Sequence, residues 1–553
     1  MKNILEELIR TALMRYAQSK GAELPSPFEF ELVVTKNSAH GDLASNIAFK
    51  LAKYVRTRPR QIADEFRSLL ETENKNFSIP IDKIEIAGGG FLNFYLSKAA
   101  LGGILYEVFN QGERYGCSDF GKGWKVLLEF VSANPTGPLT IAHGRQAAVG
   151  DSLARILEAA GHTVEKEYYL NDAGRQMRLL GESLWARYRE RLGQPAALPE
   201  DGYQGSYLLD IAGKLIEMKK DSLLREDPEK AVEFCRKFAA GEIMSGIRKD
   251  LADIDVSFDA YSNETKLYET KAVDAALQQL EQKGYLYEKD GALWFRSTDF
   301  GDDKDRVLRK ATGEYTYLAP DIAYHRGKFK RGFNRLINFW GPDHHGYIAR
   351  LKAACQALGY AADQIEIRII QLTTLYRKGE PVRMSTRAGE FVTLEELVKE
   401  VGPDAARFFF VMRKIESHLD FDLDLAKEKS QENPVYYLQY AHARIAGLLK
   451  FADIPVSPEA DVKLLAAPEE TDLIKLIGEF PKALIRASEA LEPYRLSDYL
   501  RDLAASFHKF YTLHRVVTEN QELTKARLFL ADAARIVLRN GLTLLGISHP
   551  DSM

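Results

Sequence analysis

The hydrophobic positions along the chain follow three successive patterns. Residues 1 to about 115 begin with an amphipathic helical period and continue with short alternating runs, which predicts an α+β domain. Residues 116–429 contain short apolar runs separated by helical periods, the pattern of a sheet buried between helices. From residue 430 to 553 the period is helical, with breaks near 453–468, and this predicts an all-helical domain. The pattern therefore predicts three domains.

A strand, a polar loop and a helix open the second domain. Lys125 to Val131 is a short apolar run typical of a buried parallel strand. Residues 132–137 form a turn cluster, and a helical period follows from Gly144. In an open parallel sheet such a loop lies at the carboxyl edge, where ligands bind. The free N–H groups at the start of the helix would suit a phosphate.

Further apolar runs extend this domain into a larger sheet. Strands are predicted at 164–170, 293–296 and 366–372. Residues from about 178 to 290 are mostly helical by periodicity, and we interpret them as an insertion between the two halves of the sheet. The expected fold is an α/β doubly wound parallel-sheet (Rossmann-like) domain, preceded by an N-terminal α+β domain and followed by a C-terminal all-α helical bundle.

Composition narrows the class of protein. The chain has 553 residues, of which 45% are hydrophobic and 28% charged, and its net charge is −4. Any RNA contact therefore needs local basic patches. The three cysteines show no CxxC spacing, and no apolar run could span a membrane. We expect a cytoplasmic protein with no membrane or DNA partner and no structural metal. His344 and His345 do not alter this, since adjacent strand positions point to opposite faces.

Two short segments carry a resemblance to a known family. Residues 138–143, PLTIAH, resemble the HIGH signature of class I aminoacyl-tRNA synthetases, and residues 129–137, EFVSANPTG, resemble the arginyl-tRNA synthetases in particular. Residues 383–389, RMSTRAG, stand in the place of the second class I signature, KMSKS. Both signatures are altered, at Thr140, Ala142, Arg383, Thr386 and Arg387.

The resemblance covers essentially the whole chain. It also implies that the N-terminal domain contacts the tRNA elbow and that the C-terminal bundle binds the anticodon. The further segments that are similar to family sequences are HGDLASN at 40–46, NDAGRQM at 171–177, YSNET at 261–265, YTYLAPDIAYH at 315–325 and NPVYYLQYAHARI at 433–445.

The resemblance implies a complete reaction. The expected activity is ATP-dependent ligation of L-arginine to tRNA(Arg) through an arginyl-adenylate, with release of pyrophosphate and AMP. The expected cofactor is ATP, with Mg²⁺ on its phosphates, and the expected partners are tRNA(Arg) and L-arginine. A monomer is expected. Members of this family also need tRNA before they activate arginine, and the altered signatures predict the same requirement here, because tRNA binding could complete the site.

The resemblance also implies roles for individual residues. The expected catalytic residues are His143, Arg383 and Arg387. The expected ATP-binding residues are Pro135, Thr136, Gly137, Thr140, Ala142, His143, Gly144, Met384 and Ser385. The expected arginine-binding residues are Glu129, Ser132, Asn134, Glu264, Tyr317 and Asp321. The expected tRNA-binding residues are Asn37, Tyr440 and Arg444.

These residue types suit the chemistry. A planar guanidinium is best held by a carboxylate fork, the role implied for Asp321 with support from Tyr317. Without the resemblance, Asp321 would be read as an acid that stabilises a helix N-terminus. Cations must replace the lost lysine at Thr386, and Arg387 is the first candidate, with Arg145 as a second.

The C-terminal bundle allows a similar choice. Tyr440 and Arg444 are one helical turn apart, so a base could stack on one and bond the other. For Tyr436, Tyr437 and Phe510 we expect core packing instead.

Two other functions remain open on the sequence. A different nucleotidyl transferase of the same fold would explain the loop but not the aromatic and basic bundle. A non-catalytic RNA-binding relative would explain the altered signatures. Against this, five family positions are intact, namely Glu129, Asn134, His143, Tyr317 and Asp321.

Overall fold

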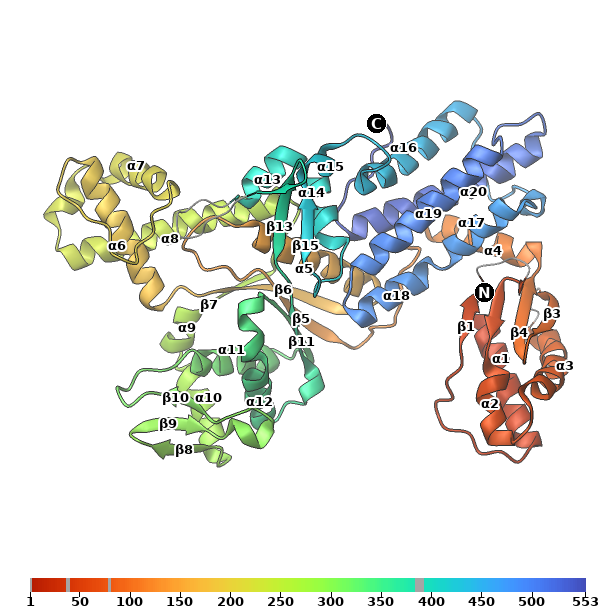
Figure 1. Ribbon diagram of the computed structural model, residues 1–553, viewed down its shortest axis with the longest axis horizontal. Helices are drawn as coiled ribbons and strands as arrows, with labels where there is room; N and C mark the ends of the chain where they lie inside the picture. The colour runs from red at the N-terminus through yellow and green to blue at the C-terminus, as the bar shows by residue number, and fades with distance from the viewer. Residues whose placement is uncertain (1, 36–39, 78–80, 383–391) are drawn as a thin grey trace.

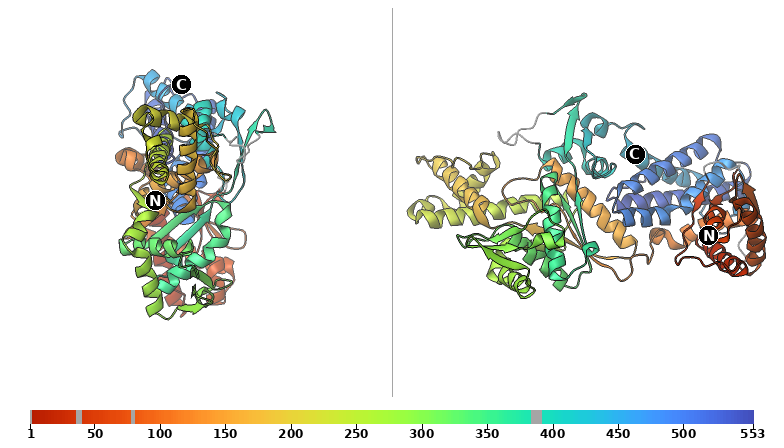
Figure 2. Two further views of the ribbon diagram at one scale, coloured as in Figure 1. Left: turned by 90° about the vertical axis from the view of Figure 1, so that its left-hand side faces the viewer. Right: turned by 60° about the horizontal axis from the view of Figure 1, so that its bottom comes forward.

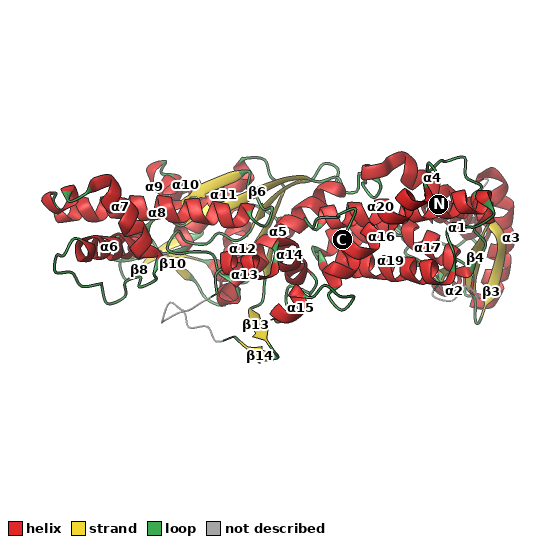
Figure 3. Cartoon of the chain, turned by 90° about the horizontal axis from the view of Figure 1, so that it is seen from above, coloured by secondary structure: helices red, strands yellow, loops and turns green. Residues whose placement is uncertain are grey.

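The molecule is elongated, with the sheet domain in the middle (Figures 1 and 2). The N-terminal domain lies beside the C-terminal helices at one end, and a group of helices projects at the other (Figure 3). The computed structural model describes residues 2–35, 40–77, 81–382 and 392–553. Six residues named above lie outside the described part, namely Asn37, Arg383, Met384, Ser385, Thr386 and Arg387.

The N-terminal domain is α+β, as the sequence predicts. Its antiparallel sheet has the order β1-β2-β4-β3. The sequence did not predict the short strand β2, because residues 37–46 have the character of a turn that leads into a helix. The elements are α1 (Lys2–Ser19), β1 (Leu32–Val34), β2 (Leu43–Ser45), α2 (Ile47–Val55), α3 (Pro59–Phe77), β3 (Ile81–Ala87) and β4 (Phe91–Leu96).

The core of this domain ends before the predicted boundary at residue 115. Its cluster of buried apolar residues runs from Leu5 to Phe94. Helix α4 (Lys98–Gln111) instead packs on α17 and α20 of the C-terminal bundle. Leu101 and Leu105 belong to the large core that the sheet domain and the bundle share. Helix α4 is therefore part of the bundle's packing.

The central sheet has the doubly wound order β12-β11-β5-β6-β7, and every neighbouring pair is parallel. The strand order of the sheet reverses between β5 and β11, and ligands bind at such a switch point. Side chains alternate between two covered faces: Val126 and Leu128 join one core and Leu127 another. The strands are β5 (Lys125–Glu129), β6 (Thr163–Leu170), β7 (Ala260–Asn263), β11 (Arg335–Trp340) and β12 (Ile365–Ile369).

The predicted insertion is shorter than expected. Three helices, α6 (Gly174–Arg191), α7 (Tyr207–Lys219) and α8 (Pro228–Ala252), form the projecting group. The range 178–290 also contains β7, which is an edge strand of the central sheet. Four residues without a clear alternation gave no strand signal, so the sequence placed β7 inside the insertion.

Two further units surround the sheet. One has a small antiparallel sheet and four helices, and it has its own core. Its elements are α9 (Glu264–Glu269), α10 (Ala272–Gln282), β8 (Leu286–Lys289), β9 (Ala292–Phe295), β10 (Arg306–Arg309), α11 (Leu318–Lys330) and α12 (Ile348–Leu358). The other comprises β13 (Thr373–Arg377), β14 (Glu380–Pro381), α13 (Leu394–Val401), α14 (Pro403–Val411), β15 (Leu419–Asp422) and α15 (Leu423–Lys427).

The C-terminal region is all helical, as predicted. Its helices are α16 (Pro434–Ala452), α17 (Pro468–Gly478), α18 (Phe480–Ala490), α19 (Tyr494–Leu513) and α20 (Gln521–Leu544). None of the helices among the described residues has the length and apolar character needed to cross a membrane.

A buried arginine ties this bundle to the sheet domain. Arg407 of α14 donates to Asp151 at 2.8 Å, to the Leu545 carbonyl at 3.0 Å and to the Ile254 carbonyl at 2.6 Å. Gly546 has φ +67°, and a Cβ there would lie 2.2 Å from the guanidinium. The glycine therefore permits the approach of Arg407.

Candidate active site

A cavity of about 590 Å³ opens at the carboxyl ends of β5, β6 and β11. It lies at the switch point of the sheet. Residues from the loop after β5, from α5 (Ile141–Ala159), α9 and α11 line it together. The predicted site residues that line it are Glu129, Ser132, Asn134, His143, Glu264, Tyr317 and Asp321. All six predicted arginine-binding residues are therefore brought together.

The loop after β5 turns through strained backbone. Val131 has φ +66° and Ser132 has φ +41°, values that are uncommon for residues other than glycine. The turn lets the Ser132 hydroxyl donate to Glu129 at 3.2 Å and accept the Tyr169 N–H at 3.1 Å. Asn134 on the same loop donates to Gln176 of α6 at 2.7 Å. The strained corner is thus held in place on both sides.

Glu129 lies at the last position of β5 and is almost buried. Its side chain reaches the cavity between Ser132 and the floor formed by α11. A buried carboxylate at a strand end needs partners, and Lys328 of α11 is its cationic partner.

His143 is held by the start of α5. The helix begins at Ile141, three residues earlier than the sequence suggested, and Thr140 is its N-cap. The Thr140 N–H donates to His143 Nδ1 at 3.1 Å, so the ring proton lies on Nε2. Burial lowers the pKa of His143 to about 4. His143 is therefore a neutral donor that lines the cavity.

The other described residues predicted to bind ATP do not line this cavity. Gly144 packs tightly, since a Cβ there would lie 2.6 Å from Leu394. The loop 135–137 is held by Tyr207 of α7, whose hydroxyl donates to the Thr136 carbonyl at 2.5 Å. Thr140 forms a bridge with Thr393. The ATP-binding roles of Pro135, Thr136, Gly137, Thr140, Ala142 and Gly144 therefore stay predictions.

Arg145 cannot replace the positive charge of the signature lysine in whose place Thr386 stands. Its side chain is fully buried, and it donates to the backbone carbonyls of Gln371, Lys414 and Ser417 at 2.8, 3.0 and 3.0 Å. Burial lowers the pKa of Arg145 to about 10. The suggestion that Arg145 acts on phosphate is wrong, because its guanidinium joins α5 to the segments before β13 and β15.

Glu264 enters the cavity from the first turn of α9. Its carboxylate accepts hydrogen bonds from Tyr169 at 3.0 Å and from Tyr268 at 3.1 Å, and burial raises its pKa. Asp172 fixes the turn, since it accepts from the Thr265 N–H at 3.0 Å.

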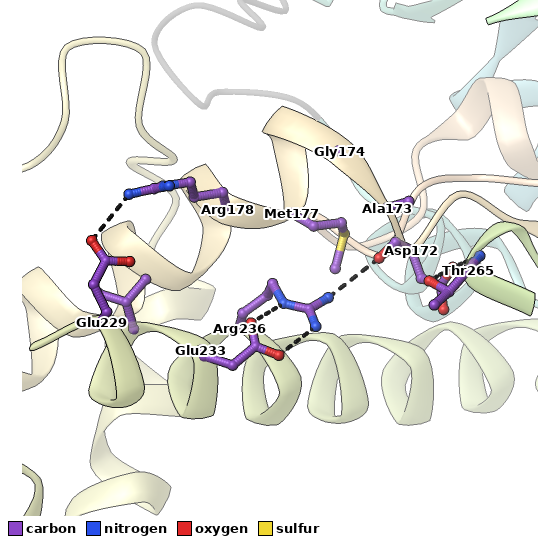
Figure 4. A pocket seen from close by; sticks show the side chains of 10 residues that line it. Asp172, Ala173, Gly174, Met177, Arg178, Glu229, Glu233, Arg236 and Thr265 are labelled. Carbon is purple, nitrogen blue, oxygen red and sulfur yellow. Dashed lines mark hydrogen bonds and ion pairs between the residues drawn. The ribbon is translucent and has the colours of Figure 1, made fainter. Parts of the chain in front are cut away.

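Asp172 also borders a second, open pocket of about 340 Å³ between α6 and α8. Figure 4 shows Asp172 between Thr265 and Arg236. Arg236 donates to the Asp172 carbonyl at 3.3 Å, so α8 supports the same turn.

Asp321 enters from the first turn of α11. Tyr347 donates to its carboxylate at 2.6 Å. Burial, together with the neighbouring Glu129 and Glu264, raises the pKa of Asp321 to about 7. Tyr317, the residue predicted to support Asp321, is 79% exposed and lies where the cavity opens. The hydrogen bond to Asp321 comes from Tyr347 instead.

If Asp321 holds arginine, as the resemblance implies, Tyr347→Phe should weaken its binding by about 1.5–3 kcal/mol, the range for a hydrogen bond to a charged group. Without this donor the pKa of Asp321 should rise further, so the loss should be larger at pH 6 than at pH 8. The arginine KM across this pH range measures both effects. An unchanged KM would show that Tyr347 does not stabilise the ionised carboxylate.

The sequence reasoning missed several positioning residues. Tyr347 follows the conspicuous segment GPDHHG, and Tyr169 lies at the end of a predicted strand. Their positions in the sequence were sufficient to make both of them candidate site residues. Asp172 lies in the segment NDAGRQM, but nothing in that segment indicates that it holds residues 263–265. Long-range partners of this kind have no local signal.

Aromatic side chains and Arg444 gather on α16. Arg444 donates to the Tyr440 hydroxyl at 2.6 Å and lies over the Tyr440 and Tyr511 rings. Phe510 is fully buried and Tyr437 packs against the core, as expected. Tyr436 stacks on Tyr440 with an interplanar angle of 9° and does not belong to the core cluster, so the core interpretation of Tyr436 is wrong.

Comparisons with known proteins agree along the whole chain. Family models match residues 3–96 (arginyl tRNA synthetase N terminal domain), 105–416 (tRNA synthetases class I (R), catalytic domain) and 438–553 (DALR anticodon binding domain). The chain is 48% identical to an arginine–tRNA ligase of Desulfosudis oleivorans, with 100% of both chains covered. It is 45% identical to that of Bacillus subtilis, with 100% of this chain and 99% of the relative covered.

A solved structure supports the fold. The arginyl-tRNA synthetase of Thermus thermophilus superposes with a TM-score of 0.77 at 24% identity over 100% of both chains. With a family model on more than half of the chain and full-length relatives near half identity, this chain belongs to the arginyl-tRNA synthetases, a class I aminoacyl-tRNA synthetase family.

Proposed function

We propose that the chain ligates L-arginine to tRNA(Arg) with ATP, through an arginyl-adenylate. The observation that carries the proposal is one cavity at the switch point of the sheet that Glu129, Glu264 and Asp321 line together. Three carboxylates within one cavity suit a ligand with two cationic groups, as arginine has. The full-length relatives named arginine–tRNA ligase support the same substrate.

The carboxylates divide the substrate between them. Asp321, already oriented by Tyr347, would bind the guanidinium in a fork, and Glu264 would add negative charge beside it. Glu129 would bind the α-ammonium, while Ser132 and Asn134 would orient the substrate carboxylate. Lysine would fill the fork poorly, because its ammonium is a point charge without a planar pair of donors.

Activation would take place beside His143. The substrate carboxylate attacks the α-phosphate of ATP, and pyrophosphate leaves. The neutral His143 would donate from Nε2 to a phosphate oxygen as charge develops there. Mg²⁺ is proposed as a companion of the ATP phosphates, that is, as part of the substrate. The charges of Arg383 and Arg387 would complete the stabilisation.

ATP–pyrophosphate exchange with each amino acid, with and without cognate tRNA, tests the proposal. Exchange should depend on arginine and should stay near background until tRNA is added. Dependence on another amino acid, or exchange without any amino acid, would contradict arginine as the substrate. A protein that binds tRNA but supports no exchange would be the non-catalytic relative. Full exchange without tRNA would contradict only the tRNA requirement.

The cluster of Tyr436, Tyr440, Arg444 and Tyr511 is proposed to bind tRNA by stacking. Tyr440→Ala should weaken tRNA binding by about 1–3 kcal/mol with little change in melting temperature. Phe451→Ala is the matched control, since this aromatic residue of the same helix is 77% exposed and lies outside the cluster. Equal losses in both variants, or a collapse of the melting temperature in Tyr440→Ala, would contradict a role in recognition.

The chain is further proposed to act as a monomer. Sedimentation equilibrium of the active enzyme, with a mass near 62.4 kDa expected, tests this.

A further inference from the structure

We propose that Lys328 is a positioning residue that acts through Glu129 to bind the α-ammonium end of arginine. This inference rests on the proposed function. Lys328 lies on α11, seven residues after Asp321, so both side chains leave the same face of the helix two turns apart. One helix therefore supplies the carboxylate proposed for one end of arginine and the cation beneath the other end.

Lys328 is enclosed and has specific partners. Its side chain is 1% exposed and forms an ion pair with Glu129, whose side chain is 6% exposed. Its ammonium also donates to Asn338 at 3.3 Å and lies 4.2 Å from the centre of the Tyr324 ring. Asn338 pairs with Glu129 across β11 and β5. These three partners fix the Lys328 ammonium beside Glu129, which lines the cavity.

A continuous chain of hydrogen bonds joins Glu129 to the backbone of Asp321. Asn338 donates to His325 Nε2 at 2.7 Å, and His325 Nδ1 therefore carries the proton that it donates to the Asp321 carbonyl at 2.8 Å. His325 is neutral, because burial and the nearby Lys328 lower its pKa. The chain runs from Glu129 on β5 through Lys328, Asn338 on β11 and His325 to the backbone carbonyl of Asp321 on α11.

Charge explains why a cation is needed there. Glu129, Glu264 and Asp321 line one cavity, and like charges oppose one another's ionisation. Lys328 donates to one oxygen of Glu129 and offsets its negative charge, while the Ser132 hydroxyl bonds the other oxygen at 3.2 Å and leaves that oxygen a free acceptor direction. Loss of Lys328 would remove the ion pair that orients the Glu129 carboxylate toward the α-ammonium.

Lys328→Met tests the inference through a difference between ligands. The variant should raise the arginine KM by at least about 30-fold, the lower end of the range for removal of one partner of a buried charge pair, and change the ATP KM little. The inhibition constant of 5-guanidinopentanoate, which is arginine without its α-amino group, should change less than about twofold. Equal weakening of arginine and of this analogue would overturn the inference.

Arg331→Met is the matched control. Arg331 ends the same helix and pairs with the buried Glu167, which does not line the cavity. This variant should lose stability without a change in the arginine KM. A similar rise in the arginine KM would show that any broken pair at this helix has the same effect, and would overturn the specific role of Lys328.

A double substitution tests the route through Glu129. In a Glu129→Gln background, Lys328→Met should cause no further loss of arginine binding, because the carboxylate on which it acts is gone. The same loss in both backgrounds would overturn the inference. If Lys328→Met does not fold, Lys328→Arg retains the charge with altered geometry, and it should affect arginine more than the analogue.

The proposed function is tested separately. It fails if the unmodified enzyme shows no arginine-dependent exchange. If the unmodified enzyme responds to arginine and the Lys328 variants do not distinguish the two ligands, only the inference fails.

Discussion

Asp321→Asn should lower kcat/KM for arginine by about 2–5 kcal/mol, that is, roughly 30- to 5000-fold, while the KM for ATP changes little. The amide keeps the size of the side chain and its hydrogen bond with Tyr347. It removes the charge that is proposed to pair with the guanidinium in the cavity, where an unpaired cation is costly. Steady-state kinetics with arginine and with ATP as the varied substrate measure the split.

The acidity of Asp321 adds a second readout to the same variant. Its pKa in the free enzyme is raised to about 7, and only the ionised form binds a guanidinium. In the unmodified enzyme, kcat/KM for arginine should therefore fall about tenfold per unit as the pH drops below 7. Asp321→Asn should lose this dependence. Asp343→Asn is the control, because Asp343 lines the same cavity and pairs with His344 at 3.1 Å. A normal arginine response in Asp321→Asn would refute the assignment.

His143→Ala should lower kcat about 10²- to 10³-fold with a smaller change in the arginine KM. Removal of one preorganised donor to a developing negative charge has this size of effect. His143 is neutral down to a pH of about 4, so the pH profile between 5 and 9 should keep its shape in the variant. Single-turnover adenylate formation isolates the step.

Two comparisons separate the donor from its structural setting. His143→Asn retains a donor and should recover part of the rate. Thr140→Ala removes the Thr140 hydroxyl, which lies 3.1 Å from His143 Nδ1, and should cost stability more than rate. Equal kcat losses for His143→Ala and Thr140→Ala would mean that His143 serves the helix start and not the phosphate.

The class of fold could be predicted from periodicity, because a buried strand or helix face requires a local pattern of apolar residues. Continuous apolar runs gave β5, β6 and β12 in nearly their observed places, and the helical period gave the C-terminal bundle. Strand β7 escaped because an edge strand of four half-buried residues has no such pattern. Helix α4 was assigned to the wrong core because an amphipathic period shows that a helix packs but not on what it packs.

The site divides in the same way. Family-like segments brought the six predicted arginine-binding residues to one cavity. Tyr347 and Lys328 were not predicted, since each acts on a carboxylate that lies 26 or 199 residues away along the chain. Arg145 was misjudged for a related reason, because a charged residue beside a signature was assumed to face the ligand.

The buried Arg407 makes the sheet domain and the C-terminal bundle depend on each other for folding. Its guanidinium is satisfied only when α5, the end of α8 and the segment after α20 are all present. A truncation after residue 430 would therefore remove one acceptor of the buried Arg407, the Leu545 carbonyl, and expose a shared core. Heating should accordingly melt the sheet domain and the bundle in one cooperative calorimetric transition, whereas the N-terminal domain, with its separate core, can give a transition of its own.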